Sequence, residues 1–272
     1  MSLRINLNAA ALNAHRQLQA TDSALGASIE RLTSGYRINR AADDPAGLAI
    51  SENLRAQISG LSQAISNSSD AVNMIRTAEG ALSEVQNLLR TMRNLALHAA
   101  NTGTNDSTAL DADQTQVQAA LASLDRIASN TQFGTKKLLD GSATGLTFQV
   151  GANANQTTQI SISSVASSAL GIASIDVTSD AQSAISALDT AISTVSTLRA
   201  ELGAAQKDLE SNIASLGVAK ENIAASESSV RDADMAAEMV EFTRNQILLQ
   251  AGVAMLTQAN TAPTALLSLL RG

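Results

Sequence analysis

Residues able to do acid–base or metal chemistry are few in this chain and lie far apart. The 272 residues include two histidines, His15 and His98, and no cysteine. A protein metal site ordinarily needs three or four donors in a cluster, and neither histidine has such neighbours in the sequence. The lack of cysteine excludes disulfides, thiolate catalysis and Cys-ligated zinc. Both histidines are therefore expected to be exposed helix residues without a special role.

The acidic pairs also lack the surroundings that catalysis requires. Asp111 and Asp113 begin like a calcium-binding loop, but Gln116 stands where that loop needs glycine, and the bidentate glutamate is missing. These acids, like Asp232 and Asp234, are expected at helix N-termini, where a carboxylate complements the helix dipole. An active site within residues 131–178 is disfavoured, since that segment has no histidine and few acids. We expect no enzyme activity, no cofactor and no metal site.

Composition excludes two further classes of protein. The net charge is −7, with one tyrosine, three phenylalanines and no tryptophan. Nucleic-acid binding needs a basic surface, and single-stranded platforms also need aromatic rings for base stacking. No apolar run approaches the ~20 residues of a membrane-spanning helix. The start of the sequence has no apolar segment typical of a secretory signal peptide. We therefore expect no nucleic-acid partner and no membrane insertion.

Helical periodicity covers most of the sequence. Apolar residues recur at spacings of three and four across 45–100, 110–127 and 185–223, a narrow stripe typical of coiled coils. Pro45 suits the first position of the first long helix, and Pro263 is expected to end the C-terminal one. Two further stripes occupy the ends of the chain, and we expect them to bury against each other and against neighbouring subunits. Their members include Leu18, Leu25, Ile29, Leu32, Met239, Ile247, Leu249, Met255 and Leu266.

Residues 131–178 have a different pattern. Leu146, Phe148 and Val150 alternate with polar residues, as do Ile160 and Ile162, and glycine, asparagine and threonine lie between the two runs. This alternation predicts one or two short β-hairpins. The expected fold is mainly α: a long antiparallel, coiled-coil-like helical rod with a small β-hairpin region near 131–178. Its expected domains are 1–44 paired with 227–272, and 45–226.

Motifs at both ends are similar to those of bacterial flagellins. They include LTSGYRINRAADDPAGLAISE from Leu32, TAEGALSE from Thr77, ESSVRDADMA from Glu227 and QILLQAGVAMLTQAN from Gln246. The resemblance covers essentially the whole chain. It implies an inner layer of paired terminal helices and, as the next layer, a rod of long helices with a β-hairpin. Flagellins often insert variable outer domains in the middle, but the short hairpin region here leaves no room for one, so we expect a minimal subunit. It also implies a structural subunit that self-assembles into the flagellar filament for swimming motility.

The resemblance further implies partners and a location. The subunit would leave the cell unfolded through the flagellar type III export machinery, without a cleaved signal peptide, and join an extracellular homopolymer. It would meet a cytoplasmic export chaperone at its C-terminal segment, the flagellar cap, and hook–filament junction proteins. The alternative is a hook–filament junction protein itself, which typically lacks the C-terminal motifs present here. A generic coiled-coil adaptor would need neither set of motifs.

Two positions depart from the family pattern. In flagellins that activate an animal Toll-like receptor, an arginine precedes a leucine by one turn of the first rod helix. Here Leu95 is retained, but Thr91 aligns with the arginine and Gln116 with a family acid. Threonine cannot supply guanidinium contacts. The resemblance therefore predicts weak or absent activation, to be tested by receptor signalling with the purified chain.

Overall fold

The computed structural model describes residues 8–101, 103 and 105–269, with side chains described as far as residue 261. The chain divides into two compact units. The first, here called the terminal unit, is Met1–Ala56 with Asn222–Gly272, and the second, the central unit, is Gln57–Glu221. Each unit therefore has its own set of packing contacts.

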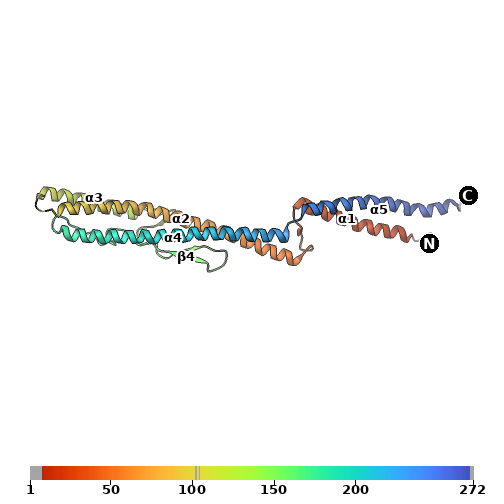
Figure 1. The fold of residues 1–272 in the computed structure, drawn as a ribbon, viewed down its shortest axis with the longest axis horizontal. Helices are drawn as coiled ribbons and strands as arrows, with labels where there is room; N and C mark the ends of the chain where they lie inside the picture. Colours follow the sequence, from red (N-terminus) through yellow and green to blue (C-terminus); the bar gives the residue numbers. More distant parts are fainter. Residues whose placement is uncertain (1–7, 102, 104, 270–272) are drawn as a thin grey trace. The chain divides into compact units, whose positions relative to one another are not determined.

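Five helices account for most of the described residues (Figure 1). They are α1 (Ala9–Ser34), α2 (Pro45–Ala99), α3 (Ser107–Asn130), α4 (Ala181–Arg231) and α5 (Met235–Leu269). Helices α2 and α4 have 55 and 51 residues, and each passes from one unit into the other. Such lengths are possible because no proline interrupts either helix after its first residue. The expected mainly α fold with long helices is confirmed.

Acidic side chains cap four of the helices, and in α4 the acid is Asp180, which accepts from Ser183 N–H at 3.0 Å. The Asp44 carboxylate accepts a hydrogen bond from the Gly47 backbone N–H at 2.8 Å, directly ahead of Pro45. Asp106 does the same at the start of α3, and the Asp234 carboxylate accepts from Ala236 N–H at the start of α5, at 2.9 Å. Each carboxylate satisfies a backbone donor that the helix itself leaves unpaired.

The C-terminal helix does not end at Pro263, contrary to the sequence expectation. Helix α5 continues to Leu269. A proline lacks the N–H that would bond to the carbonyl four residues earlier, which here belongs to Ala259. The Asn8 side-chain amide donates to that Ala259 carbonyl at 2.9 Å. A partner from another helix thus replaces the hydrogen bond that proline removes, so the helix passes through it.

The core of the central unit lies between α2, α3 and α4. The ion pair between Arg93 and Asp189 and that between Arg76 and Glu210 show that α2 and α4 run antiparallel, because later residues of α2 meet earlier residues of α4. Large side chains that are fully buried here include Ile75, Leu82, Leu89, Met92, Leu124, Leu188 and Leu202. They fall on the three-and-four stripes that the sequence shows in each helix.

Two small antiparallel hairpins occupy the segment between α3 and α4. Strand β1 (Gln132–Phe133) pairs with β2 (Lys136–Lys137), and β3 (Leu146–Gln149) pairs with β4 (Thr157–Ile160). In the second hairpin Leu146 lies opposite Ile160, and these apolar side chains contact the core of the central unit. The predicted β-hairpin region is confirmed, although Ile162 lies beyond the end of its strand.

Candidate functional site

Titratable side chains do not assemble into a chemical centre in the part of the chain that the structure describes. No group of three or more His, Asp or Glu residues there could hold a metal ion. No helix within the same residues is long and apolar enough to cross a bilayer. His15 is exposed, whereas His98 Nδ1 lies 2.6 Å from Oδ2 of the buried Asp113. That pair joins the end of α2 to α3, a contact that sequence spacing alone did not reveal.

The terminal helices form an antiparallel pair within the terminal unit. Arg31 of α1 makes an ion pair with Glu238 near the start of α5, at 3.7 Å, while Asn8, ahead of α1, bonds to Ala259 near its other end. The least exposed positions of each helix recur every three or four residues, as in a coiled coil. They are Ala11, Ala14, Leu18, Thr21, Leu25, Ser28 and Leu32 in α1, and Glu238, Phe242, Asn245, Leu249, Gly252, Leu256 and Ala259 in α5.

This contact surface between α1 and α5, hereafter the seam, is narrow and partly polar. Only Thr21 and Ser28 are fully buried along α1, and the Thr21 hydroxyl donates back to the Gln17 carbonyl at 2.9 Å. At Gly252 a Cβ atom would lie 3.1 Å from Cδ1 of Leu18, which is closer than most real contacts. Glycine therefore lets the helices approach, but the seam buries little large apolar surface.

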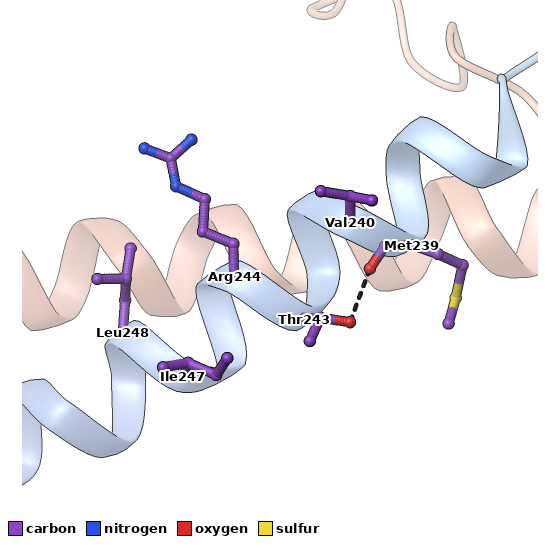
Figure 2. Close-up of a pocket in the computed structure, with 6 residues that line it drawn as sticks. All are labelled: Met239, Val240, Thr243, Arg244, Ile247 and Leu248. Atoms are coloured by element: carbon purple, nitrogen blue, oxygen red, sulfur yellow. Dashed lines mark hydrogen bonds between the residues drawn. The ribbon is translucent and has the colours of Figure 1, made fainter.

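A second apolar surface lies on α5 outside the seam. Seven large apolar side chains are exposed there, and we call them the outer face of α5. They are Met235, Met239, Val240, Ile247, Leu248, Val253 and Met255, with 46–66% of each residue exposed. Figure 2 shows a shallow hollow on this face, lined by Met239, Val240, Thr243, Arg244, Ile247 and Leu248. The Thr243 hydroxyl donates to the Met239 carbonyl of the same helix, so the hollow is largely apolar.

The structure divides the nine side chains expected to bury in assembly. Leu18, Leu25, Leu32 and Leu249 are half-buried in the seam, whereas Ile29, Met239, Ile247 and Met255 are exposed. Leu266 lies beyond the residues whose side chains are described. Sequence reasoning missed Val240, Leu248 and Val253 because it sought one stripe. The available signal was that α5 has apolar residues on every side and no single polar face, so one stripe could not describe its contacts.

The linkers that join the terminal helices to the rest of the terminal unit are held together. Arg37 N–H donates to the Arg231 carbonyl at 2.7 Å, and Ala233 N–H donates to the Gly35 carbonyl at 2.9 Å. The Arg231 guanidinium lies 4.6 Å from the centre of the Tyr36 ring and 3.1 Å from the Glu52 carboxylate. These contacts bring the end of α1 beside the start of α5, which sets the antiparallel pairing.

Comparison with known proteins decides the family. Two flagellin family profiles match: the bacterial flagellin N-terminal helical region over residues 5–144, and the C-terminal helical region over residues 185–270. Flagellin of Bacillus subtilis is 44% identical over 99% of this chain and all of its own length. Flagellin of Halalkalibacterium halodurans is 47% identical over 98% of this chain and 99% of its own. The chain belongs to the bacterial flagellins.

Solved structures agree with this assignment. The crystal structure of Bacillus cereus flagellin aligns with a TM-score of 0.51 and 27% identity, covering 56% of this chain and 88% of that one. This flagellin is therefore a structural subunit of the bacterial flagellar filament, located in the extracellular flagellum, and it is not an enzyme. Nothing in the comparisons favours a hook–filament junction protein.

The receptor-like positions of this flagellin lie in the central unit. Thr91 is exposed on α2, and its hydroxyl donates to the Asn87 carbonyl of the same helix at 3.0 Å. Leu95 is half-buried against the core, and Gln116 is exposed on α3. Because the Thr91 hydroxyl already has a backbone partner, it offers little to a receptor. Weak or absent receptor activation stays a prediction.

Proposed function

We propose that the terminal unit is the inner layer of the filament and that the outer face of α5 is its contact surface with neighbouring subunits. One observation carries this proposal. Among its described residues, Ile38 is the only buried apolar side chain of the terminal unit, whereas the central unit has a continuous buried core. A unit that buries so little apolar surface gains little against the entropy of ordering its chain. Neighbouring subunits would supply the missing burial.

The layers of the subunit follow the helix junctions in this proposal. Residues 1–44 with 227–272 form the inner layer, and residues 45–226 form the helical rod outside it. The linker before Pro45 supports the first limit, whereas the break between α4 and α5 lies at 232–234, a few residues after the second limit. Packing contacts divide the chain slightly differently, after Ala56 and after Glu221, because the helices that leave each junction begin inside the terminal unit.

The same exposed surface explains why the chain would need partners before assembly. Contiguous exposed apolar side chains promote non-specific association in a free protein. We infer that a cytoplasmic export chaperone covers residues 235–271 until the unfolded chain enters the type III export machinery. The absence of cysteine suits this route, because no disulfide can form before the unfolded chain is exported. Outside the cell, the hook–filament junction and cap proteins would receive the chain. Slower amide hydrogen exchange across 235–271 on chaperone binding supports this inference; unchanged exchange there contradicts it.

A charge placed on the outer face tests the assembly surface. Ile247 is 60% exposed in the free chain, so Ile247→Asp leaves the seam and the central core intact. We expect its critical concentration for seeded polymerisation to rise at least about 10-fold. Burying an isoleucine contributes about 1.5–3 kcal/mol, and a tenfold change corresponds to about 1.4 kcal/mol. Electron microscopy and sedimentation measure the outcome.

Two further variants make the result specific. Ile247→Leu keeps the apolar surface and should polymerise like the unchanged chain. Leu249→Asp places the same charge in the seam and should also loosen the pairing of α1 with α5, seen as faster hydrogen exchange in both helices. If Ile247→Asp forms filaments at the unchanged critical concentration, the outer face of α5 is not the contact surface.

A further inference from the structure

The methionines of this chain fall into two groups with opposite exposure. Met74 and Met92 are 4% and 0% exposed in the core of the central unit. Met235, Met239 and Met255 are 46%, 50% and 65% exposed, and all three lie on the outer face of α5. In Figure 2 the sulfur of Met239 projects away from the α5 ribbon. Oxidants in solution therefore reach the thioethers of α5 and not those of the core.

Oxidation of a methionine changes the chemistry of the surface that carries it. A thioether is apolar and flexible, whereas a sulfoxide is polar and needs a hydrogen-bond donor when it is buried. Near Met239 the Thr243 hydroxyl already donates to a backbone carbonyl, and the exposed Arg244 lies 3.3 Å from Glu241. Met255 lines a hollow that is mostly apolar, with Ala14, Leu18, Leu248 and Gly252, and with Gln17 and Thr21 as its polar members. A sulfoxide at these positions is more strongly hydrated than a thioether, so burying it against a neighbouring subunit costs more free energy.

We propose that Met235, Met239 and Met255 form a peroxide-sensitive modification site that controls whether the free subunit can assemble. The thioether sulfur attacks one oxygen of hydrogen peroxide and takes it up as a sulfoxide. The O–O bond breaks, and the second oxygen leaves as water with both protons. Sulfur loses two electrons and the peroxide gains them. The oxidised face no longer buries against a neighbouring subunit.

This site acts on the free chain and not on the finished filament. Once neighbouring subunits cover the outer face, the three sulfur atoms are excluded from solvent, so assembly protects them. Methionine sulfoxide is reduced enzymatically by methionine sulfoxide reductases, which makes the block reversible in the free chain. The inference rests on the proposed function, because the outer face must be the assembly surface for its oxidation to matter.

The test compares peroxide-treated and untreated full-length chain. Peptide mass spectrometry should find sulfoxide first at Met235, Met239 and Met255 of the free chain, at least about 10-fold faster than at Met74 and Met92. The oxidised chain should need at least about 10-fold more protein for seeded polymerisation, in line with loss of one large apolar contact. Treatment with methionine sulfoxide reductases should restore the original value, and assembled filaments should resist oxidation at all three positions.

A matched variant identifies the residues responsible. Met235→Leu, Met239→Leu and Met255→Leu combined keep an apolar face without oxidisable sulfur, so this variant should polymerise equally before and after peroxide. Normal polymerisation of the oxidised unchanged chain would overturn the inference. Equal loss of polymerisation in the leucine variant would also overturn it. Failure of the untreated chain to polymerise would instead contradict the proposed function.

Discussion

Asn8 performs two tasks at the start of α1 that depend on different atoms of one side chain. Its Oδ1 accepts a hydrogen bond from Ala11 N–H at 3.1 Å and caps α1. Its Nδ2 donates to the Ala259 carbonyl of α5, which Pro263 leaves without the usual helical donor. Asparagine is among the few residues that offer both a donor and an acceptor at this length. The residue therefore joins the two ends of the terminal unit.

A substitution series separates these tasks. Asn8→Asp keeps the cap but removes the donor, and should destabilise the seam by about 1 kcal/mol, the usual contribution of one hydrogen bond. Asn8→Ala removes both the cap and the donor, and should lower the stability of the seam by about 1 kcal/mol more than Asn8→Asp does. In a Pro263→Ala chain the new N–H can bond to Ala259, so Asn8→Asp should have almost no effect. Hydrogen exchange of α1 amides measures the difference; an equal loss in both backgrounds contradicts this role for Asn8.

Polar contacts of Glu210, most of them within α4, make the stability of the folded state depend on pH. Glu210 accepts hydrogen bonds from Lys207 Nζ and Gln206 Nε2, both at 2.7 Å, and lies 3.4 Å from Arg76 Nη2 of α2. The hydrogen bond from Lys207 and that from Gln206 lower the pKa of Glu210 from 4.5 to about 2. A carboxyl with a depressed pKa stabilises the folded state above its unfolded pKa.

The contribution of Glu210 to the free energy of unfolding should be fully present above pH 4.5 and should disappear as the pH falls to about 2. Glu210→Gln cannot lose a charge, so its Tm should fall less steeply than that of the unchanged chain across this range. Thermal unfolding followed by circular dichroism between pH 5 and 2 measures the two slopes. Glu84→Gln, which removes a charge from an exposed position of α2, should retain the steep slope. Parallel slopes for Glu210→Gln and the unchanged chain would contradict this assignment.

How well each element could be predicted depended on how its apolar residues are arranged. The stripe from Leu61 to Ala99 sits on a helix with a polar opposite side, so periodicity identified both the helix and its buried face. Helix α5 has apolar residues on every side. Periodicity therefore predicted the helix but not which residues it buries, so it could not show that Leu249 lies in the seam and Ile247 does not. The continuation of α5 through Pro263 could not be predicted from the sequence either. It depends on a hydrogen bond between Asn8 and Ala259, which are 251 residues apart.

The two units of the molecule differ in how many apolar side chains they bury. The central unit has a core built from three helices and the hairpin segment. The terminal unit holds α1 against α5 through a narrow, partly polar seam, and its outer face remains exposed. The central unit therefore buries a core within one chain, and under the proposed function the terminal unit completes its burial against neighbouring subunits.

The most direct test is a cryo-EM reconstruction of filaments grown from the purified chain, at a resolution that shows side chains. The account predicts that Val240, Ile247 and Met255, which are 60–66% exposed in the free chain, become buried against side chains of adjacent subunits, while α1 and α5 keep their antiparallel seam. A reconstruction in which these three side chains still face solvent, with subunits held together through the central unit alone, would contradict it.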